Sequence, residues 1–183
     1  MITHYELMQR IFEQQYQDEL ARKSGIDGSV APLTAGLGLL VAGVSFVFTR
    51  MPALNAGAEY ECYEKVALFV TYIVFGISII LAIICGLRIW SMLHNNQYKY
   101  LPSPKRQLIH YENLEKYYEE NNINMQGLEK DILRNYIANL AECTTFNMNT
   151  NDTRFGKRVE AYRFLGTSFL FLFLAMVLTV MLL

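Results

Sequence analysis

Three long stretches without a charged residue limit what this chain can fold into more than any other feature. Residues 30–49, 66–87 and 164–183 contain no Asp, Glu, Lys, Arg or His. A helix needs about 20 apolar residues to cross the roughly 30 Å hydrocarbon core of a bilayer, so each stretch is long enough to span one. A soluble helix of this length keeps a polar face, which these stretches lack. We therefore expect an all-α membrane protein with three transmembrane helices.

The positive charges indicate which side of the membrane each flank faces. Of the 16 Lys and Arg residues, three precede the first stretch, two lie between the first and the second, and eleven lie between the second and the third. Cytoplasmic flanks collect Lys and Arg. We predict that the N-terminus and the segment before the third stretch are cytoplasmic, and that the C-terminus is outside. The alternative is a signal peptide cleaved near residues 56–58, but about thirty residues precede its apolar run, against the short n-region of such peptides.

These observations divide the chain into six segments. We expect a cytoplasmic amphipathic helix in residues 1–28, transmembrane helices in 29–49, 66–94 and 163–183, a short outer loop in 50–65, and a cytoplasmic helical segment in 95–162. The second transmembrane helix includes a short inner extension.

Both cytoplasmic segments carry apolar residues at helical spacing. In the N-terminal segment this face includes Phe12 and Tyr16, and Gly25 and Gly28 are expected to break the helix before the membrane. In the central segment residues 98–102 read as an extended linker, Ser103 and Pro104 begin a helix, and residues 121–122 end it. From residue 128 a longer helix follows. Either the polar run at 147–152 interrupts this helix, or the helix continues through the run into the third stretch.

Small residues in the first stretch predict close helix packing. In lipid, small side chains let helix backbones approach closely, and packing then drives association. The residues expected at such a contact are Gly36, Gly38, Ala42, Gly43 and Ser45. We therefore expect a protein neighbour on at least one side of this helix, and the second stretch of the same chain is the simplest such neighbour.

Two groups of basic residues between the second and third stretches are the candidate ligand site. In the first group cations alternate with aromatic side chains, the combination that single-stranded nucleic acids use for phosphate contact and base stacking. Its members are Tyr98, Lys99, Tyr100, Lys105, Arg106, His110 and Tyr111. The second group comprises Arg154, Lys157, Arg158 and Arg163. The alternative for both groups is that the cations set the topology and bind anionic lipid headgroups.

Signals for catalysis are absent from the sequence. His4, His94 and His110 lie in separate segments, without the spacing of a metal site, and no glycine-rich phosphate loop or nucleophile motif occurs. We expect no enzymatic activity, no metal and no cofactor. The absence of Asp, Glu, Lys, Arg and His from the apolar stretches also argues against a proton-coupled transporter or a carboxylate-lined cation filter.

The layout resembles the small membrane effectors of bacterial anti-phage systems, which include the SLATT family and the effector of the Hailong system. The resemblance rests on a short inner helix, the small-residue junction at 21–28, the hairpin of two apolar stretches, and the Asn- and Arg-containing helix at 151–163. The third, chain-terminal stretch departs from the usual SLATT plan and is closer to a Hailong-type effector. The resemblance implies a homo-oligomeric pore in the bacterial inner membrane, gated by a nucleotide or a single-stranded DNA oligomer from a partner nucleotidyltransferase.

Two functions are therefore expected. The first is an oligomeric membrane channel or pore-forming effector in anti-phage defence, gated by a polyanionic ligand at the basic groups. The second is a non-conducting membrane scaffold whose cytoplasmic helices dock a protein partner.

Overall fold

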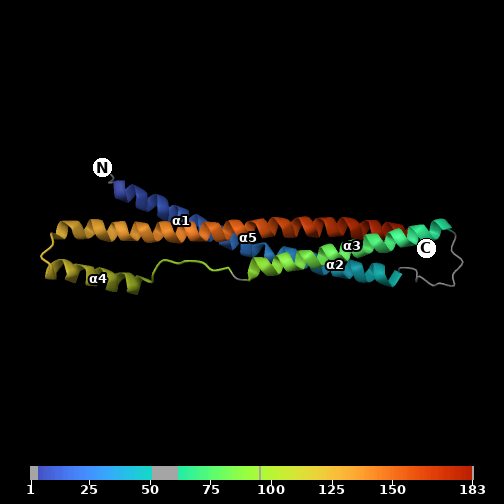
Figure 1. Ribbon diagram of the computed structural model, residues 1–183, viewed down its shortest axis with the longest axis horizontal. Coiled ribbons are helices and arrows are strands. Elements are labelled where there is room, and N and C mark those ends of the chain that lie inside the picture. The colour runs from blue at the N-terminus through green and yellow to red at the C-terminus, as the bar shows by residue number, and fades with distance from the viewer. Residues whose placement is uncertain (1–3, 51–61, 95, 183) are drawn as a thin grey trace. The chain divides into compact units, whose positions relative to one another are not determined.

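A computed structural model describes residues 4–50, 62–94 and 96–182, and every regular element in these ranges is helical (Figure 1). The elements are α1 (His4–Gly28), α2 (Val30–Arg50), α3 (Cys62–Leu93), α4 (Pro104–Glu120), the 3-10 turn η1 (Met125–Gly127) and α5 (Leu128–Met181). Three helical spans are long and apolar enough to cross a membrane: α1 continuing into α2, α3, and α5. The expected all-α chain with three membrane-length helices is confirmed. The expected outer loop falls largely on residues 51–61, outside the described residues.

The chain divides into two compact units. The polar unit comprises Met1–Gly25 and Asn96–Thr153, and the membrane unit comprises Ile26–Asn95 and Arg154–Leu183. The chain passes from one unit to the other within α1, between α3 and α4, and within α5.

Apolar residues repeated at every seventh position of α1 and α2 contribute to the core of the membrane unit. These residues, each at most 1% exposed, are Ile26, Leu33, Leu40 and Val47. A seven-residue repeat keeps one helix face against its neighbours along its whole length. Helix α3 contributes Val74, Phe75, Cys85, Ile89 and Met92 to this core, and α5 contributes Ala161, Leu165, Leu172 and Ala175.

Two of the small residues in α2 lie against α5. A Cβ atom placed on Gly36 would lie 2.8 Å from Cδ2 of Leu165, and one on Gly43 would lie 2.7 Å from Cδ2 of Leu172. Each leucine therefore occupies the space that a larger residue on α2 would fill. The other three residues expected at this contact, Gly38, Ala42 and Ser45, are exposed in the chain.

A pair of serines joins α3 to α5 inside the membrane unit. The Ser78 hydroxyl donates to the carbonyl of Ser168 at 2.9 Å, and the Ser168 hydroxyl donates to the carbonyl of Ser78 at 2.7 Å. Both residues are fully buried. Because a hydroxyl in an apolar surrounding is costly without a partner, the reciprocal bonds favour one register of the two helices.

The expected break before the first span is shorter than the sequence indicates. Helix α1 continues through Gly25 to Gly28, and only Ser29 separates it from α2. The Ser29 hydroxyl and amide both donate to the carbonyl of Ile26, at 2.6 and 3.1 Å. Burial of Ile26 in the core outweighs the weak helix propensity of the neighbouring glycines.

In the polar unit the predicted start and end of the central helix are confirmed. Ser103 caps α4 by accepting a hydrogen bond from the Arg106 amide, and Pro104 occupies the first turn. The helix ends at Glu120 with Asn121 as its C-cap, and Asn122 follows with a φ of 52°, the left-handed conformation that asparagine tolerates better than most residues. A small core of Tyr16, Leu140 and Cys143 packs α1 against α5.

Replacing Gly43 with leucine should destabilise the protein, whereas the same change at Gly38 should not. At Gly43 the new side chain meets Leu172, and overpacking of this kind costs about 1–3 kcal/mol. At Gly38 no atom lies within 4 Å of the new Cβ. Thermal unfolding of the detergent-solubilised variants measures the difference, and equal melting temperatures would contradict the described packing of α2 on α5.

Candidate functional site

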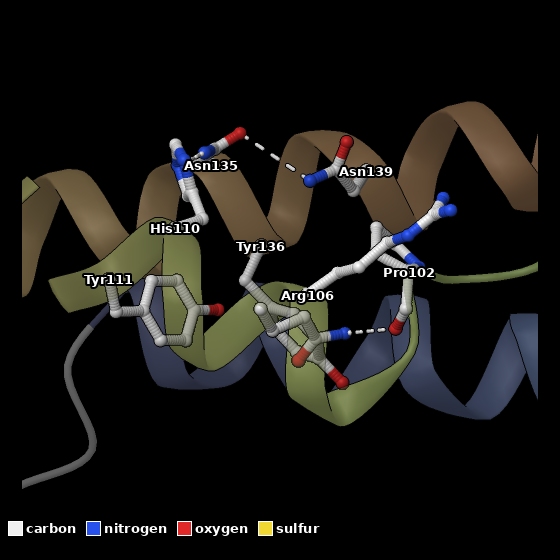
Figure 2. A pocket seen from close by; sticks show the side chains of 8 residues that line it. Pro102, Arg106, His110, Tyr111, Asn135, Tyr136 and Asn139 are labelled. Atoms are coloured by element: carbon white, nitrogen blue, oxygen red, sulfur yellow. Dashed lines mark hydrogen bonds between the residues drawn. The ribbon is translucent and has the colours of Figure 1, made fainter. Parts of the chain in front are cut away.

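A cavity of about 170 Å³ lies in the polar unit between α4 and α5 (Figure 2). Pro102 of the linker borders it at one side, and the two helices supply the remaining lining. These residues are Arg106, Gln107, His110 and Tyr111 of α4, and Asn135, Tyr136 and Asn139 of α5. Figure 2 shows His110 and Asn135 at one end, and Pro102, Arg106 and Asn139 at the other.

Helical spacing brings the lining residues together. Arg106 and His110 are four residues apart on α4, as are Asn135 and Asn139 on α5, so each pair lies on one helix face. The two faces are joined by a 2.6 Å hydrogen bond between Nδ2 of Asn135 and Nε2 of His110. Nδ2 of Asn139 in turn donates to Oδ1 of Asn135 at 3.4 Å. These bonds orient the amides and the imidazole before any ligand binds.

The chemistry of this cavity suits an anionic, aromatic ligand. Arg106 is exposed and forms no ion pair among the described residues, and no Asp or Glu lines the cavity. A guanidinium group binds phosphate oxygens in a bidentate manner. The rings of His110 and Tyr111 offer faces for stacking, and the amides of Asn135 and Asn139 can donate to and accept from a base edge.

Tyr136 lines the cavity, and its hydroxyl is bonded to α1. Its hydroxyl donates to Oε1 of Glu13 on α1 at 3.1 Å. Burial raises the pKa of Tyr136 above the ordinary value, and the hydrogen bond to Glu13 raises this pKa further. The phenol therefore keeps its proton, and its bond to α1, up to a higher pH than an ordinary tyrosine does.

The structure brings together three residues of the first predicted group, Arg106, His110 and Tyr111. Lys105 is exposed and does not line the cavity. The remaining members, Tyr98, Lys99 and Tyr100, belong to the linker before α4 and are bonded to other parts of the polar unit.

These linker contacts occupy the side chains that the sequence suggested for ligand binding. Nζ of Lys99 lies 2.5 Å from Oε1 of Glu142, and the hydrogen bond from this ammonium lowers the pKa of the Glu142 carboxyl. The Tyr98 hydroxyl donates to Oδ1 of Asn151 at 2.6 Å. The Tyr100 hydroxyl accepts from Nζ of Lys23 at 3.1 Å.

Two residues of the second predicted group bond the end of α3 in the membrane unit. Arg154 is 3% exposed; its Nε donates to the carbonyl of Met92 at 3.0 Å, and its guanidinium pairs with Asp27. Nζ of Lys157 donates to the carbonyl of Ser91 at 2.9 Å. The last carbonyls of a helix lack partners within the helix. A cation at this end is also attracted by the negative end of the helix dipole.

The other two cations of this group are Arg158, which is half-buried, and Arg163, which is exposed. The guanidinium of Arg158 stacks on the ring of Phe155, with 4.5 Å between the guanidinium carbon and the ring centroid, and Arg163 is exposed. The second group thus belongs to the membrane unit, whereas the cavity at Arg106 belongs to the polar unit.

Two buried asparagines in the polar run of α5, for which no partner was expected from the sequence, hold the linker in place. Asn147 accepts from the amide of Lys99 and donates to its carbonyl, both at 2.9 Å. Nδ2 of Asn151 donates to the main-chain oxygen of Glu19 at 2.8 Å. Both asparagines are fully buried. Because their amides bond other segments, they do not compete for the backbone of α5, and the helix continues unbroken through the polar run.

The α5 side of the cavity was also missed. No ligand role was expected from the sequence for Asn135, Tyr136 or Asn139. The sequence did contain a signal for this side: Asn135 and Asn139 are four residues apart on α5, and the aromatic Tyr136 lies next to Asn135. These residues face Arg106 of α4 across the cavity.

Comparison of the chain with protein-family models, with curated proteins and with solved structures found no match.

Replacing Asn147 with alanine should lower the free energy of unfolding by about 2 kcal/mol, because the Lys99 amide and carbonyl lose their partner. The matched control is Asn149→Ala, which changes an exposed asparagine two residues away on the same helix. Denaturant or thermal unfolding in detergent measures both. Equal stabilities of the two variants would show that the linker does not depend on this amide.

The raised pKa of Tyr136 predicts a stability that falls at alkaline pH. Its contribution is complete below the pKa of an unfolded tyrosine, about 10, and declines as the pH rises through the higher pKa of the folded state. Tyr136→Phe should therefore lose less stability than the natural protein between about pH 9 and pH 11. Thermal unfolding across this range tests the difference, with the exposed Tyr117→Phe as control.

Proposed function

We propose that this chain is a homo-oligomeric membrane channel or pore-forming effector, and that a nucleotide or single-stranded oligonucleotide bound in the polar unit gates it. The observation that carries the proposal is the cavity at Arg106, His110 and Tyr111, in a chain with three membrane-length helices. The polar unit lies in the cytoplasm in this proposal, as the distribution of Lys and Arg predicts.

Helix α5 offers a physical route from ligand to membrane. It contributes Asn135, Tyr136 and Asn139 to the cavity, and its C-terminal part supplies the third membrane-length segment. A ligand changes the gate only by the difference between its affinities for the closed and open states. A ligand that contacts both α4 and α5 has such a difference whenever gating changes the contact between these two helices.

The cavity is too small for a whole nucleotide, so we propose that the protein also contacts other parts of the ligand outside it. Binding pockets for small molecules generally measure about 300–1,000 Å³, so 170 Å³ holds one part of a nucleotide. Tyr136 also lines a second cavity of about 490 Å³, which is bordered by Arg10, Tyr16 and Leu101. This second cavity is also lined by Glu13. In our proposal an oligonucleotide places one phosphate at Arg106 and extends past Tyr136 towards Arg10.

The biological role that we propose is anti-phage defence. The layout of the chain resembles that of SLATT and Hailong-type effectors, and pore opening in the bacterial inner membrane would arrest growth or kill an infected cell. A partner nucleotidyltransferase would supply the ligand.

Exposed apolar residues favour a second candidate function, a membrane scaffold that docks a protein partner. Leu7 and Ile11 of α1 are 51% and 46% exposed, and Leu108 and Ile109 of α4 are 58% and 47% exposed. Apolar side chains in a polar region mark contact sites when they are contiguous. A scaffold would conduct no current with any ligand.

A charge-reversal pair tests the proposed ligand site. Arg106→Glu should weaken ligand binding about ten- to a hundredfold, since one charge-assisted contact is worth about 1.5–3 kcal/mol. Lys105→Glu makes the same charge change one residue away, outside the cavity, and should weaken binding much less. Binding of labelled deoxyoligonucleotides to the purified protein, and absorbance at 260 nm that co-purifies with it, provide the readout.

Conductance in proteoliposomes then tests the function. We expect the oligonucleotide to change the current through the natural protein and to have little effect on Arg106→Glu. A protein that binds the oligonucleotide but never conducts would support the scaffold. Equal binding by both charge-reversed variants would remove the Arg106 cavity from the mechanism.

A further inference from the structure

Helix α5 enters the membrane unit through residues 154–163, and Arg158 in this segment has no acid to neutralise it. Among the described residues, the acids of the membrane unit at this end, Asp27 and Glu160, are paired with Arg154 and Arg88. Arg158 forms neither an ion pair nor a hydrogen bond with the residues that the structure describes. Its charge is therefore available to a partner outside the chain.

Two aromatic residues share one face of α5 with Arg158. Phe155 and Tyr162 are exposed and lie three residues before and four residues after it, which is the spacing of neighbours on a helix surface. The guanidinium of Arg158 stacks on the ring of Phe155. Stacking uses the face of the guanidinium and leaves the N–H groups at its edge, which match the oxygens of a phosphate. The hydroxyl of Tyr162 is a further donor for such an oxygen.

The position of Arg158 along α5 fits the headgroup layer of a bilayer. At a rise of 1.5 Å per residue, Arg158 lies about 9 Å before the charge-free stretch of α5. The charge-free stretch of α2 begins at residue 30, and Gly36 of this helix packs on Leu165, so by α2 the apolar region begins level with about residue 159 of α5. Arg158 therefore lies about 2–9 Å outside the apolar region, and the headgroup layer is about 5–8 Å thick.

Beyond Tyr162 the same face of α5 offers room for an acyl chain. Phe169 and Phe173 are exposed, and the helical period places them on this face. Gly166 lies between Tyr162 and Phe169 and is also exposed, and a Cβ added to it would meet no atom within 4 Å. The face therefore carries aromatic rings on both sides of an open position, where a hydrocarbon chain can lie against the helix backbone.

We propose that this face of α5 binds an anionic phospholipid, with the phosphate at Arg158 and Tyr162 and an acyl chain at Gly166. A phospholipid combines the two parts that the face recognises, whereas a soluble phosphate compound leaves the apolar part uncovered. An anionic headgroup is favoured over a zwitterionic one, because the zwitterionic headgroup brings a cation of its own. The inference is independent of the proposed function, because this face belongs to the membrane unit and the cavity at Arg106 to the polar unit.

The test uses the full-length protein in a neutral detergent, with dihexanoyl phosphatidylglycerol as the probe. Dihexanoyl phosphatidylcholine has the same chains with a zwitterionic headgroup, and glycerol phosphate has the phosphate without the chains. Calorimetric titration and the shift of the melting temperature report binding. We expect phosphatidylglycerol to bind about tenfold more tightly than either of the other two compounds.

Charge-matched variants locate the site. Arg158→Gln should weaken binding of phosphatidylglycerol about tenfold, because the phosphate loses a charge-assisted contact. Arg163→Gln removes the same charge from an exposed residue on another face of α5, and should weaken binding much less. Gly166→Leu should also weaken binding, because its side chain takes the place of the acyl chain. The open surroundings of Gly166 let this variant fold normally, which its melting temperature without lipid checks.

Three results would overturn the proposal. Equal binding of phosphatidylcholine would indicate a general lipid contact, and equal binding of glycerol phosphate would indicate a site for a soluble phosphate. Equal losses in Arg158→Gln and Arg163→Gln would indicate attraction to the charge of the whole segment. If Arg158→Gln folds poorly, unchanged binding by Gly166→Leu decides against the proposal instead. Oligonucleotide binding by Gly166→Leu should remain normal, which separates failure of this site from failure of the proposed function.

Discussion

Main-chain groups without a partner within a helix, in a linker or in the last turn of a helix, need other hydrogen-bond partners, and side chains of α5 provide several of them. Within the polar unit, Asn147 bonds the amide and carbonyl of Lys99 in the linker. Within the membrane unit, Arg154 and Lys157 bond carbonyls at the end of α3. A buried polar group without a partner is costly, so these bonds define the path of the chain after the second span. They also explain why a polar run persists inside a 54-residue helix without breaking it.

The same constraint applies more strongly in lipid, where packing and hydrogen bonds must hold the helices together. Gly36 and Gly43 admit the side chains of Leu165 and Leu172, and Ser78 is bonded to Ser168. The glycines provide close approach, and the serines favour one register. Together they make the membrane unit a specific bundle of helices.

The distribution of cations narrows the candidate ligand site. Charge and aromatic content pointed to two groups of residues, but three of their cations already bond the chain: Lys99 pairs with Glu142, Arg154 pairs with Asp27, and Lys157 bonds the carbonyl of Ser91. Arg106 is left exposed beside His110 and Tyr111, at a cavity to which α5 adds two amides. A cation in a sequence indicates a ligand only after its partners within the fold are known, because a carboxylate or carbonyl of the same chain satisfies it equally well.

The sequence by itself determined the features that depend on neighbouring residues. Charge-free stretches of about 20 residues predicted three membrane-length helices, and Ser103 and Pro104 predicted the start of α4, because helix length and capping are local properties. Only the tertiary structure decided which small residues pack, which cations remain exposed, and that Asn147 holds the linker. Those outcomes depend on contacts between residues far apart in the chain, such as Lys99 with Asn147 and Gly43 with Leu172. The period of a helix shows which residues share a face, but not which face meets a neighbour.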